Sequence, residues 1–142
     1  MTFLTLLFSL LLSGLHTSQN QASDLHVQIG ETRSDRGKIL VLVFDQEEGF
    51  PDQVDKAFRK FALSPQNGKA ELTLSNLPPG KYAFTVLHDE DGDEKMATNF
   101  LGIPTEKYGF SNNPRIYFSP PSFESAAVAL DGKPKTIQIK LR

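Results

Sequence analysis

Cysteine is absent from the 142 residues of this chain, and so is tryptophan. The absence of cysteine excludes disulfide scaffolds, thiolate zinc sites, a cysteine nucleophile and the lipid-modified cysteine of a bacterial lipoprotein. A domain of this size can bury roughly two-thirds of its unfolded surface without covalent cross-links. We therefore expect the hydrophobic core alone to stabilise the fold.

An excess of charge of either sign is also missing. The chain has 15 Lys and Arg against 17 Asp and Glu, which gives a formal net charge of −2 at pH 7. Broad electrostatic attraction to nucleic acid or anionic lipid requires clustered Lys and Arg. The composition therefore predicts no nucleic-acid partner and no general attraction to anionic lipid.

The first 23 residues contain no charged side chain and are rich in Leu and Phe. Such a block predicts an export signal, although no Lys or Arg precedes the apolar run and no A-x-A cleavage site is visible. The run from Phe3 to Leu12, even extended to Leu15, is shorter than the roughly 20 residues that a transmembrane helix needs. We expect a signal peptide at 1–23 and a periplasmic or extracellular domain at 24–142, without a transmembrane segment. The alternative is a buried N-terminal helix.

Apolar and polar residues alternate with a period of two through most of the chain beyond Asp24, which indicates half-buried strands. Residues typical of turns, mainly Gly, Pro, Asn and Asp, separate these segments. The expected strands lie at 25–30, 38–45, 70–75, 81–88, 126–130 and 136–141.

One segment departs from the period of two. Between Val54 and Ala62 the apolar residues fall at helical spacing, and Asp52 is placed to cap the first turn, which predicts a short amphipathic helix over 52–63. Short strands, Gly and Pro turns and one short helix favour a single, mostly β domain. We expect an antiparallel β-sandwich of immunoglobulin-like or transthyretin-like type, without the Cys-Trp-Cys core of antibody domains.

Five carboxylates crowd the six residues from Asp89 to Glu94, directly after an expected strand. Asp89, Asp91 and Asp93 match positions 1, 3 and 5 of the calcium-loop pattern. Glu94 stands where that pattern has glycine, and Phe100 stands where it has a bidentate Glu. We hypothesise that Asp89, Asp91, Asp93 and Glu94 bind Ca²⁺; the alternative is a solvated charge run without a metal.

The stretch from Thr98 to Phe123 is rich in aromatic residues, with no expected strand inside it. Long loops of this kind are functional or pack by their own side chains. Two interpretations follow: a self-packed lid, or a recognition surface in which aromatic rings and neighbouring polar groups contact a protein or a carbohydrate. The candidate partner-binding residues are His88, Glu106, Tyr108, Phe110, Ser111 and Asn112.

The string from Leu77 to Ser125 resembles an exported bacterial family catalogued as domain of unknown function 2141. The resemblance covers nearly all of 24–142 and implies a β-sandwich and export, with no established activity. The acidic stretch departs from the family's D-x-N-x-N-G-x-x-D, with Ala97 in place of the last aspartate. The matching motifs are Leu77-Pro78-x-Gly80-x-Tyr82-Ala83, His88-Asp89, Gly102-Ile103-Pro104-x-Glu106, Gly109-Phe110-Ser111-Asn112 and Pro120-Pro121-x-Phe123.

Recognisable catalytic motifs are missing: the chain has no G-x-S-x-G, no H-E-x-x-H, no phosphate-binding Gly loop and no dinucleotide fingerprint. Of the histidines, His88 is the candidate base. We expect an exported, non-enzymatic module in which calcium is structural and the 88–123 region contacts a partner. The alternative is a metal-free envelope-structural or protein-interaction module, and a hydrolase-type enzyme is the third possibility.

Overall fold

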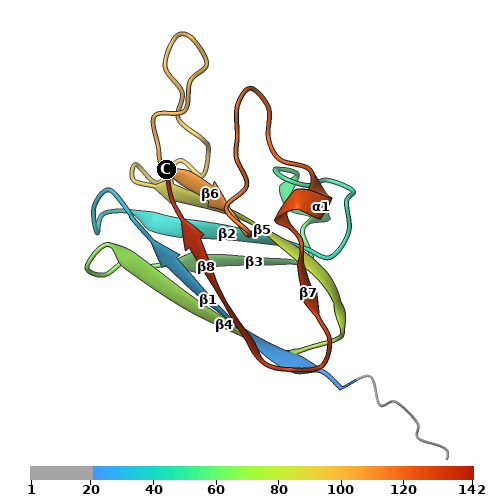
Figure 1. Ribbon diagram of the computed structural model, residues 1–142. Helices are drawn as coiled ribbons and strands as arrows, with labels where there is room; N and C mark the ends of the chain where they lie inside the picture. Colours follow the sequence, from blue (N-terminus) through green and yellow to red (C-terminus); the bar gives the residue numbers. More distant parts are fainter. Residues whose placement is uncertain (1–20) are drawn as a thin grey trace, which may run out of the picture.

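Residues 21–142 are described by a computed structural model, in which two β-sheets pack face to face (Figure 1). The prediction of a mostly β sandwich is confirmed. The helical segments of this range are a 3₁₀ turn, η1 (Val54–Lys56), and one short helix, α1 (Phe123–Ala126). The strands are β1 (Ser23–Gly30), β2 (Lys38–Phe44), β3 (Arg59–Leu63), β4 (Lys69–Leu77), β5 (Gly80–Asp89), β6 (Tyr108–Phe110), β7 (Val128–Leu130) and β8 (Lys135–Lys140).

One sheet has the strand order β4-β1-β8, and the other has the order β3-β2-β5-β6, with β7 paired to the start of β5. Every pairing of these strands is antiparallel except that of β1 with β8, which is parallel. The sandwich is therefore antiparallel as predicted, with the β1-β8 pair as the one departure among these strands. The chain reaches β8 from β7, which lies in the other sheet, so β8 can run alongside β1 without the helical crossover that a parallel pair within one sheet requires.

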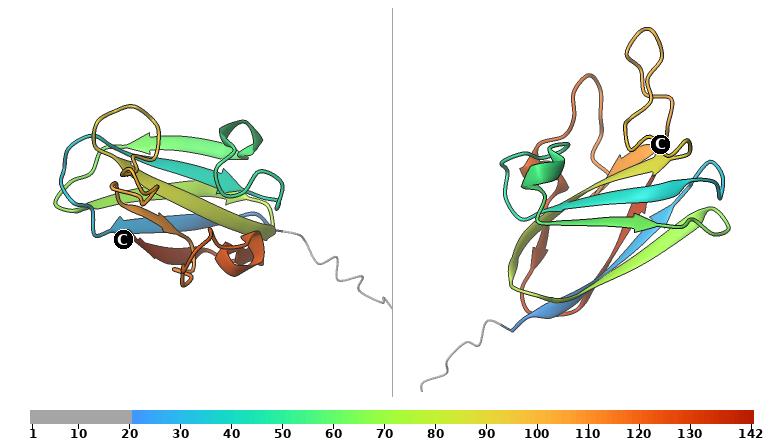
Figure 2. Two further views of the ribbon diagram at one scale, coloured as in Figure 1. Left: turned by 90° about the horizontal axis from the view of Figure 1, so that it is seen from above. Right: turned by 180° about the vertical axis from the view of Figure 1, so that it is seen from behind.

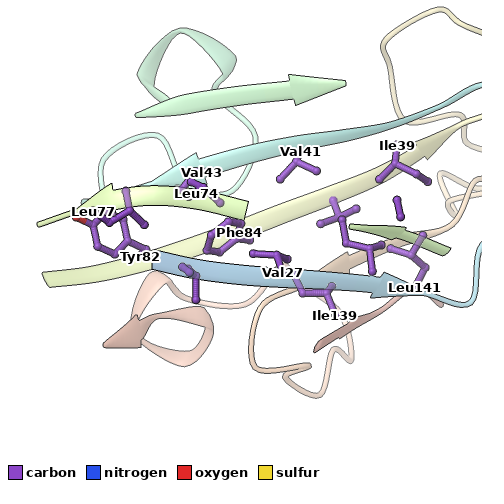
Figure 3. Close-up of a cluster of buried hydrophobic side chains, with 14 of the residues drawn as sticks. Val27, Ile39, Val41, Val43, Leu74, Leu77, Tyr82, Phe84, Ile139 and Leu141 are labelled. Carbon is purple, nitrogen blue, oxygen red and sulfur yellow. The ribbon is translucent and has the colours of Figure 1, made fainter. Parts of the chain in front are cut away.

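The core lies between the two sheets and is built from alternate residues of the strands, as the period of two predicts (Figure 3). These side chains are almost completely shielded from solvent, and their burial is the main stabilising contribution to the fold. The principal members are Leu25, Val27 and Ile29 of β1, Ile39, Val41 and Val43 of β2, and Tyr82, Phe84 and Val86 of β5.

The predicted helix over 52–63 is wrong. Only η1 is helical there; its N-cap is Gln53, which makes no side-chain capping hydrogen bond. The following residues form β3, which pairs with the free edge of β2. Phe61 and Leu63, two residues apart in β3, pack against the core, whereas Ala62 between them is exposed. Backbone pairing with β2 favours the strand over the helix, because a short isolated helix is only marginally stable, whereas a strand at a sheet edge gains backbone hydrogen bonds.

The aromatic stretch 98–123 is divided by β6, which pairs with β5. Gly109 in the middle of β6 is required by close packing: a Cβ there would lie 2.8 Å from the carbonyl oxygen of Lys140. Beside it, Tyr108 and Arg142 exchange two backbone hydrogen bonds of 3.3 and 2.9 Å. These bonds join the edge of one sheet to the end of the other, so β6 anchors the middle of the stretch to the sandwich.

The predicted signal at 1–23 lies mainly outside the described residues, 21–142. Ser23, assigned to that segment by the sequence, is the first residue of β1 and is buried. No helix within 21–142 has the length and apolar character to cross a membrane.

Phe110 and Phe100 test how the aromatic stretch divides between core and surface. Phe110 is buried in a second apolar cluster with Phe44 and Phe123, whereas Phe100 is 95% exposed. We expect Phe110→Ala to lower the free energy of unfolding by about 3–5 kcal/mol. Phe100→Ala should change it by less than about 0.5 kcal/mol. Urea unfolding measures both; equal and small effects would contradict the assignment of Phe110 to the core.

Candidate functional site

Asp89 ends β5 and organises the acidic loop that follows. Its side chain is buried, at 1% exposure, and both of its carboxylate oxygens accept backbone hydrogen bonds. The N–H of Gly92 donates to Oδ1 at 2.8 Å, and the N–H of Glu94 donates to Oδ2 at 3.0 Å. A short acidic side chain that accepts from its own loop is a common way to fix a turn. Asp89 therefore shapes the loop from inside.

Glu106 holds the same loop from its far end. It is buried, and its two carboxylate oxygens accept hydrogen bonds from the backbone N–H groups of Glu90 (3.0 Å) and Ala97 (3.1 Å). Glu90 stands near the beginning of the acidic run 89–94, and Ala97 lies three residues beyond its end. Glu106, predicted to contact a partner, is thus a structural residue that ties the loop to the start of β6.

Asp89, Asp91 and Glu106 form a three-carboxylate group, each offering one oxygen within 4.8 Å of the oxygens offered by the other two. Asp89 and Glu106 are buried, while Asp91 is exposed and leaves the group open to solvent. Two of the four predicted metal ligands are therefore brought together. The other two, Asp93 and Glu94, do not belong to this group.

The spacing of the calcium-loop pattern could not identify Glu106 as a ligand, because Glu106 lies beyond Phe100, the last position of that pattern. Glu106 does belong to the Gly102-Ile103-Pro104-x-Glu106 motif, which is one of the motifs that carry the family resemblance. Asp93 instead supports its own turn, since its Oδ1 accepts the backbone N–H of Lys95 at 2.9 Å. The path of the loop therefore decides which carboxylates converge.

The crowding of carboxylates has an electrostatic consequence for Asp91. A hydrogen bond from the backbone N–H of Asp93 lowers its pKa, but desolvation, a hydrogen bond shared with Asp89, and repulsion from Asp93 and Glu106 outweigh that bond. The pKa of Asp91 is raised as a result. Deprotonating Asp91 places a negative charge beside others, and a bound cation would offset that repulsion.

Glu90 faces away from this group and joins the loop between β1 and β2. Its carboxylate accepts a hydrogen bond from Ser34 Oγ at 2.6 Å and forms ion pairs with Arg33 and Arg36 at 3.3 and 3.5 Å. The pKa of Glu90 is lowered, chiefly by the Ser34 hydrogen bond and further by His88 and the two arginines, against the opposing effect of desolvation. Glu90 therefore contributes stability in its ionised form.

His88 is completely buried on the core-facing side of β5. Its Nδ1 accepts the backbone N–H of Arg33 at 3.4 Å, and its Nε2 lies 2.9 Å from the carbonyl oxygen of Arg36, to which it donates. Both ring nitrogens are thus used to hold the loop between β1 and β2. His88 lacks the exposure that the predicted contact with a partner requires.

Ser111 and Asn112, also predicted for partner binding, hold the segment around α1. The buried Ser111 hydroxyl accepts the backbone N–H of Phe84 at 2.9 Å and donates to the carbonyl of Ala126. The Asn112 side chain donates to the carbonyl of Ala127 at 2.6 Å. The Ser111 hydroxyl and the side-chain NH2 of Asn112 are thus occupied within the fold, which favours the self-packed interpretation for this part of the aromatic stretch.

Tyr108 and Phe110 lie at a groove of about 450 Å³ over the outer face of the β3-β2-β5-β6 sheet. The groove floor is mainly apolar, and Thr85 is a polar residue within it. The buried Oγ1 of Thr85 has no hydrogen-bond partner within 21–142. Glu94 of the acidic loop and Met96, two residues further along the chain, reach one part of its lining. The groove therefore connects the acidic loop with two of the predicted partner-binding residues.

Together, the fold and the site define a small β-sandwich with a carboxylate-bearing loop beside an apolar groove. The chain belongs to the family described as "Uncharacterized protein conserved in bacteria (DUF2141)", whose model matches residues 27–138. The match spans the acidic loop and Glu106, and it confirms the family resemblance. No curated protein and no solved structure matches the chain.

Gly37 and Gly92 provide a matched test of the close packing between Gly37, in the loop between β1 and β2, and the backbone of Asp89. Both have positive φ, 70° and 78°, but a Cβ at Gly37 would lie 2.0 Å from the carbonyl oxygen of Asp89, whereas a Cβ at Gly92 would meet nothing within 4 Å. We expect Gly92→Ala to cost about 1 kcal/mol from backbone strain, and Gly37→Ala to cost at least about 2 kcal/mol more. Chemical denaturation measures both; similar losses would contradict the close approach at Asp89.

Glu90→Gln tests the ionised Glu90. Because the folded-state pKa lies below the ordinary 4.5, the stabilisation is present above that value and is lost as pH falls through the lowered pKa. We expect a loss of about 1 kcal/mol at pH 7 that disappears with acidification below pH 4.5. Glu124→Gln is the control, since its ion pair with Lys81 is exposed and should contribute little. A pH-independent loss in thermal melts of the Glu90 variant would contradict the assignment.

Proposed function

We propose that this protein is an exported, non-enzymatic binding module in which a structural Ca²⁺ holds the acidic loop. The observation that carries the proposal is the convergence of Asp89, Asp91 and Glu106, each with an oxygen within 4.8 Å of the others. Ca²⁺ takes six to eight oxygen ligands, and carboxylates, backbone carbonyls and waters all serve. Three carboxylates supply the negative charge, and the solvent-facing side leaves room for water ligands.

The chemistry of the group favours calcium over other metals. All three residues offer oxygen, and no nitrogen or sulfur ligand from residues 21–142 joins them. Zinc and copper prefer His and Cys, whereas hard cations prefer carboxylates. Magnesium requires a nearly ideal octahedron at shorter distances, and a loop with one exposed ligand suits the more adaptable coordination of calcium.

Calcium would act by drawing Asp91 against the two buried carboxylates. Asp89 and Glu106 already hold the backbone from Glu90 to Ala97, so the ion would add the one side chain of the group that lies outside. Glu94 and Met96 of the same segment line the groove. A fixed loop therefore presents a fixed groove wall to a protein or carbohydrate partner.

Export and the absence of catalysis are parts of the proposal with separate support. The uncharged, Leu-rich block at 1–23 supports export. The candidate base, His88, is buried with both ring nitrogens engaged by backbone groups, and this supports a non-enzymatic role.

The metal-free alternative has one observation in its favour. All four oxygens of Asp89 and Glu106 already accept backbone hydrogen bonds, so the loop has internal support without an ion. In that case the protein is an envelope-structural or interaction module, and calcium has no effect on its stability.

Thermal melting in EDTA and in millimolar Ca²⁺ distinguishes the calcium-binding proposal from the metal-free alternative. A ligand at a hundredfold excess over its Kd stabilises the native state by about 2.7 kcal/mol, so we expect the wild-type Tm to rise by several degrees. In Asp91→Asn the rise should disappear, while the EDTA melting temperature should equal or exceed that of the wild type because repulsion is relieved. Asp131→Asn, an exposed carboxylate between β7 and β8, is the matched control and should keep the rise. An unchanged wild-type Tm excludes the calcium site.

A further inference from the structure

Two loops of this protein expose large apolar side chains at their tips. The first loop, 95–105, exposes Phe100 (95%), Leu101 (68%) and Ile103 (55%), and the second loop, 114–121, exposes Tyr117 (74%) and leaves Phe118 fully exposed. Single exposed apolar residues are common on folded proteins, but a concentration of them marks an interaction site. Neither the core nor the proposed calcium site uses these five side chains.

Both loops rise from the body of the molecule in the same direction (Figure 1), as the view from behind also shows (Figure 2, right). They form two separate projections, so their apolar side chains are presented on convex tips. A convex apolar tip suits a soft, extended apolar phase better than it suits a small ligand, which binds in a concave site.

The tip of the first loop is held in shape by its own hydrogen bonds. The Asn99 side-chain oxygen accepts the backbone N–H groups of Leu101 (2.9 Å) and Ile103 (3.0 Å), and the N–H of Gly102 donates to the Asn99 carbonyl at 2.9 Å. This closed turn carries Phe100 and Leu101 at its apex. The apolar side chains are therefore displayed by a folded turn, which reduces the entropy lost on binding.

Charge on the two loops is of one sign. Lys95 and Arg115 are the only charged residues of the two loops, which contain no Asp or Glu. Neither forms an ion pair with any residue in 21–142. The whole chain has a net charge of −2, and the carboxylates of Asp93 and Glu94 directly precede Lys95, so the positive charges belong to the two loops themselves and the acidic run lies outside them.

We infer that the two loops insert into the surface of a bilayer containing anionic phospholipid. Phe100, Leu101 and Phe118 would enter the boundary between headgroups and acyl chains, where apolar side chains of peripheral proteins are buried. Tyr117 suits the same interface, with its ring apolar and its hydroxyl wet. Lys95 and Arg115 are placed to contact lipid phosphates. The inference extends beyond the proposed calcium site and does not depend on it.

The absence of tryptophan from the chain gives a direct test on the full-length protein, because a single introduced Trp reports one position. Phe100→Trp and Phe118→Trp are mixed with vesicles of phosphatidylcholine and phosphatidylglycerol, in EDTA and in Ca²⁺. We expect a blue shift of Trp emission and quenching by brominated lipid. Val54→Trp, at an exposed apolar position of η1 outside the two loops, is the control and should show neither.

The proposed contact of Lys95 and Arg115 with lipid phosphates is tested in the Phe100→Trp variant. Lys95→Glu with Arg115→Glu should weaken vesicle binding by at least about tenfold on anionic vesicles. Lys69→Glu with Lys133→Glu makes the same change of charge at exposed positions outside the two loops and should leave binding unchanged.

Three results would overturn the inference. The first is that neither Trp shifts with vesicles in either buffer; the second is that Val54→Trp shifts equally. The third is a blue shift without lipid that grows with protein concentration, accompanied by a dimer in light scattering, which would make the tips a contact between copies of the chain. Because insertion and the calcium-dependent Tm are separate readouts, failure of one leaves the other unaffected.

Discussion

The buried carboxylates of Asp89 and Glu106 are the constraint on which the functional part of this molecule depends. Each is removed from solvent and accepts two backbone N–H bonds from the segment between them. A buried charge is tolerated only when its oxygens are satisfied, so the loop has to follow a path that brings those donors inward. The end of β5 is thereby coupled to the start of β6, and everything that projects between them starts from a fixed base.

The same arrangement concentrates negative charge. The path that satisfies Asp89 and Glu106 also brings Asp91 beside them. A backbone hydrogen bond from Asp93 lowers the pKa of Asp91, but desolvation, the hydrogen bond with Asp89 and repulsion from Asp93 and Glu106 together raise it. The proposed calcium ion would offset this repulsion with oxygen ligands that the loop already holds in place. Above this base, the segment changes character: carboxylates give way to the apolar tip at Phe100 and to a lone cation at Lys95. One segment thus combines an internally braced base, a proposed ion site and a proposed lipid-facing tip.

Much of the sandwich could be predicted from sequence, because a half-buried strand reveals its inner face through alternation, as in Leu25, Val27 and Ile29. The helix expected over 52–63 failed because residues 59–63 pair with the free edge of β2, and the local sequence does not show which strand edges are left free. At the site, the acidic run located Asp89 and Asp91. It also suggested Asp93 and Glu94, which lie outside the observed group. The spacing of the acidic run could not predict that Glu106 belongs to the group.

By itself, the sequence determined the β-sandwich class, the uncharged block at 1–23, the family, and the place of the acidic loop, since each is written in composition, periodicity or contiguous motifs. Tertiary structure decided which carboxylates converge, that His88 and Ser111 face inward, and that two apolar tips project in one direction. The physical reason is that convergence and exposure depend on how residues distant in the chain are packed. Sheet register and buried hydrogen bonds set that packing, and no local pattern encodes it.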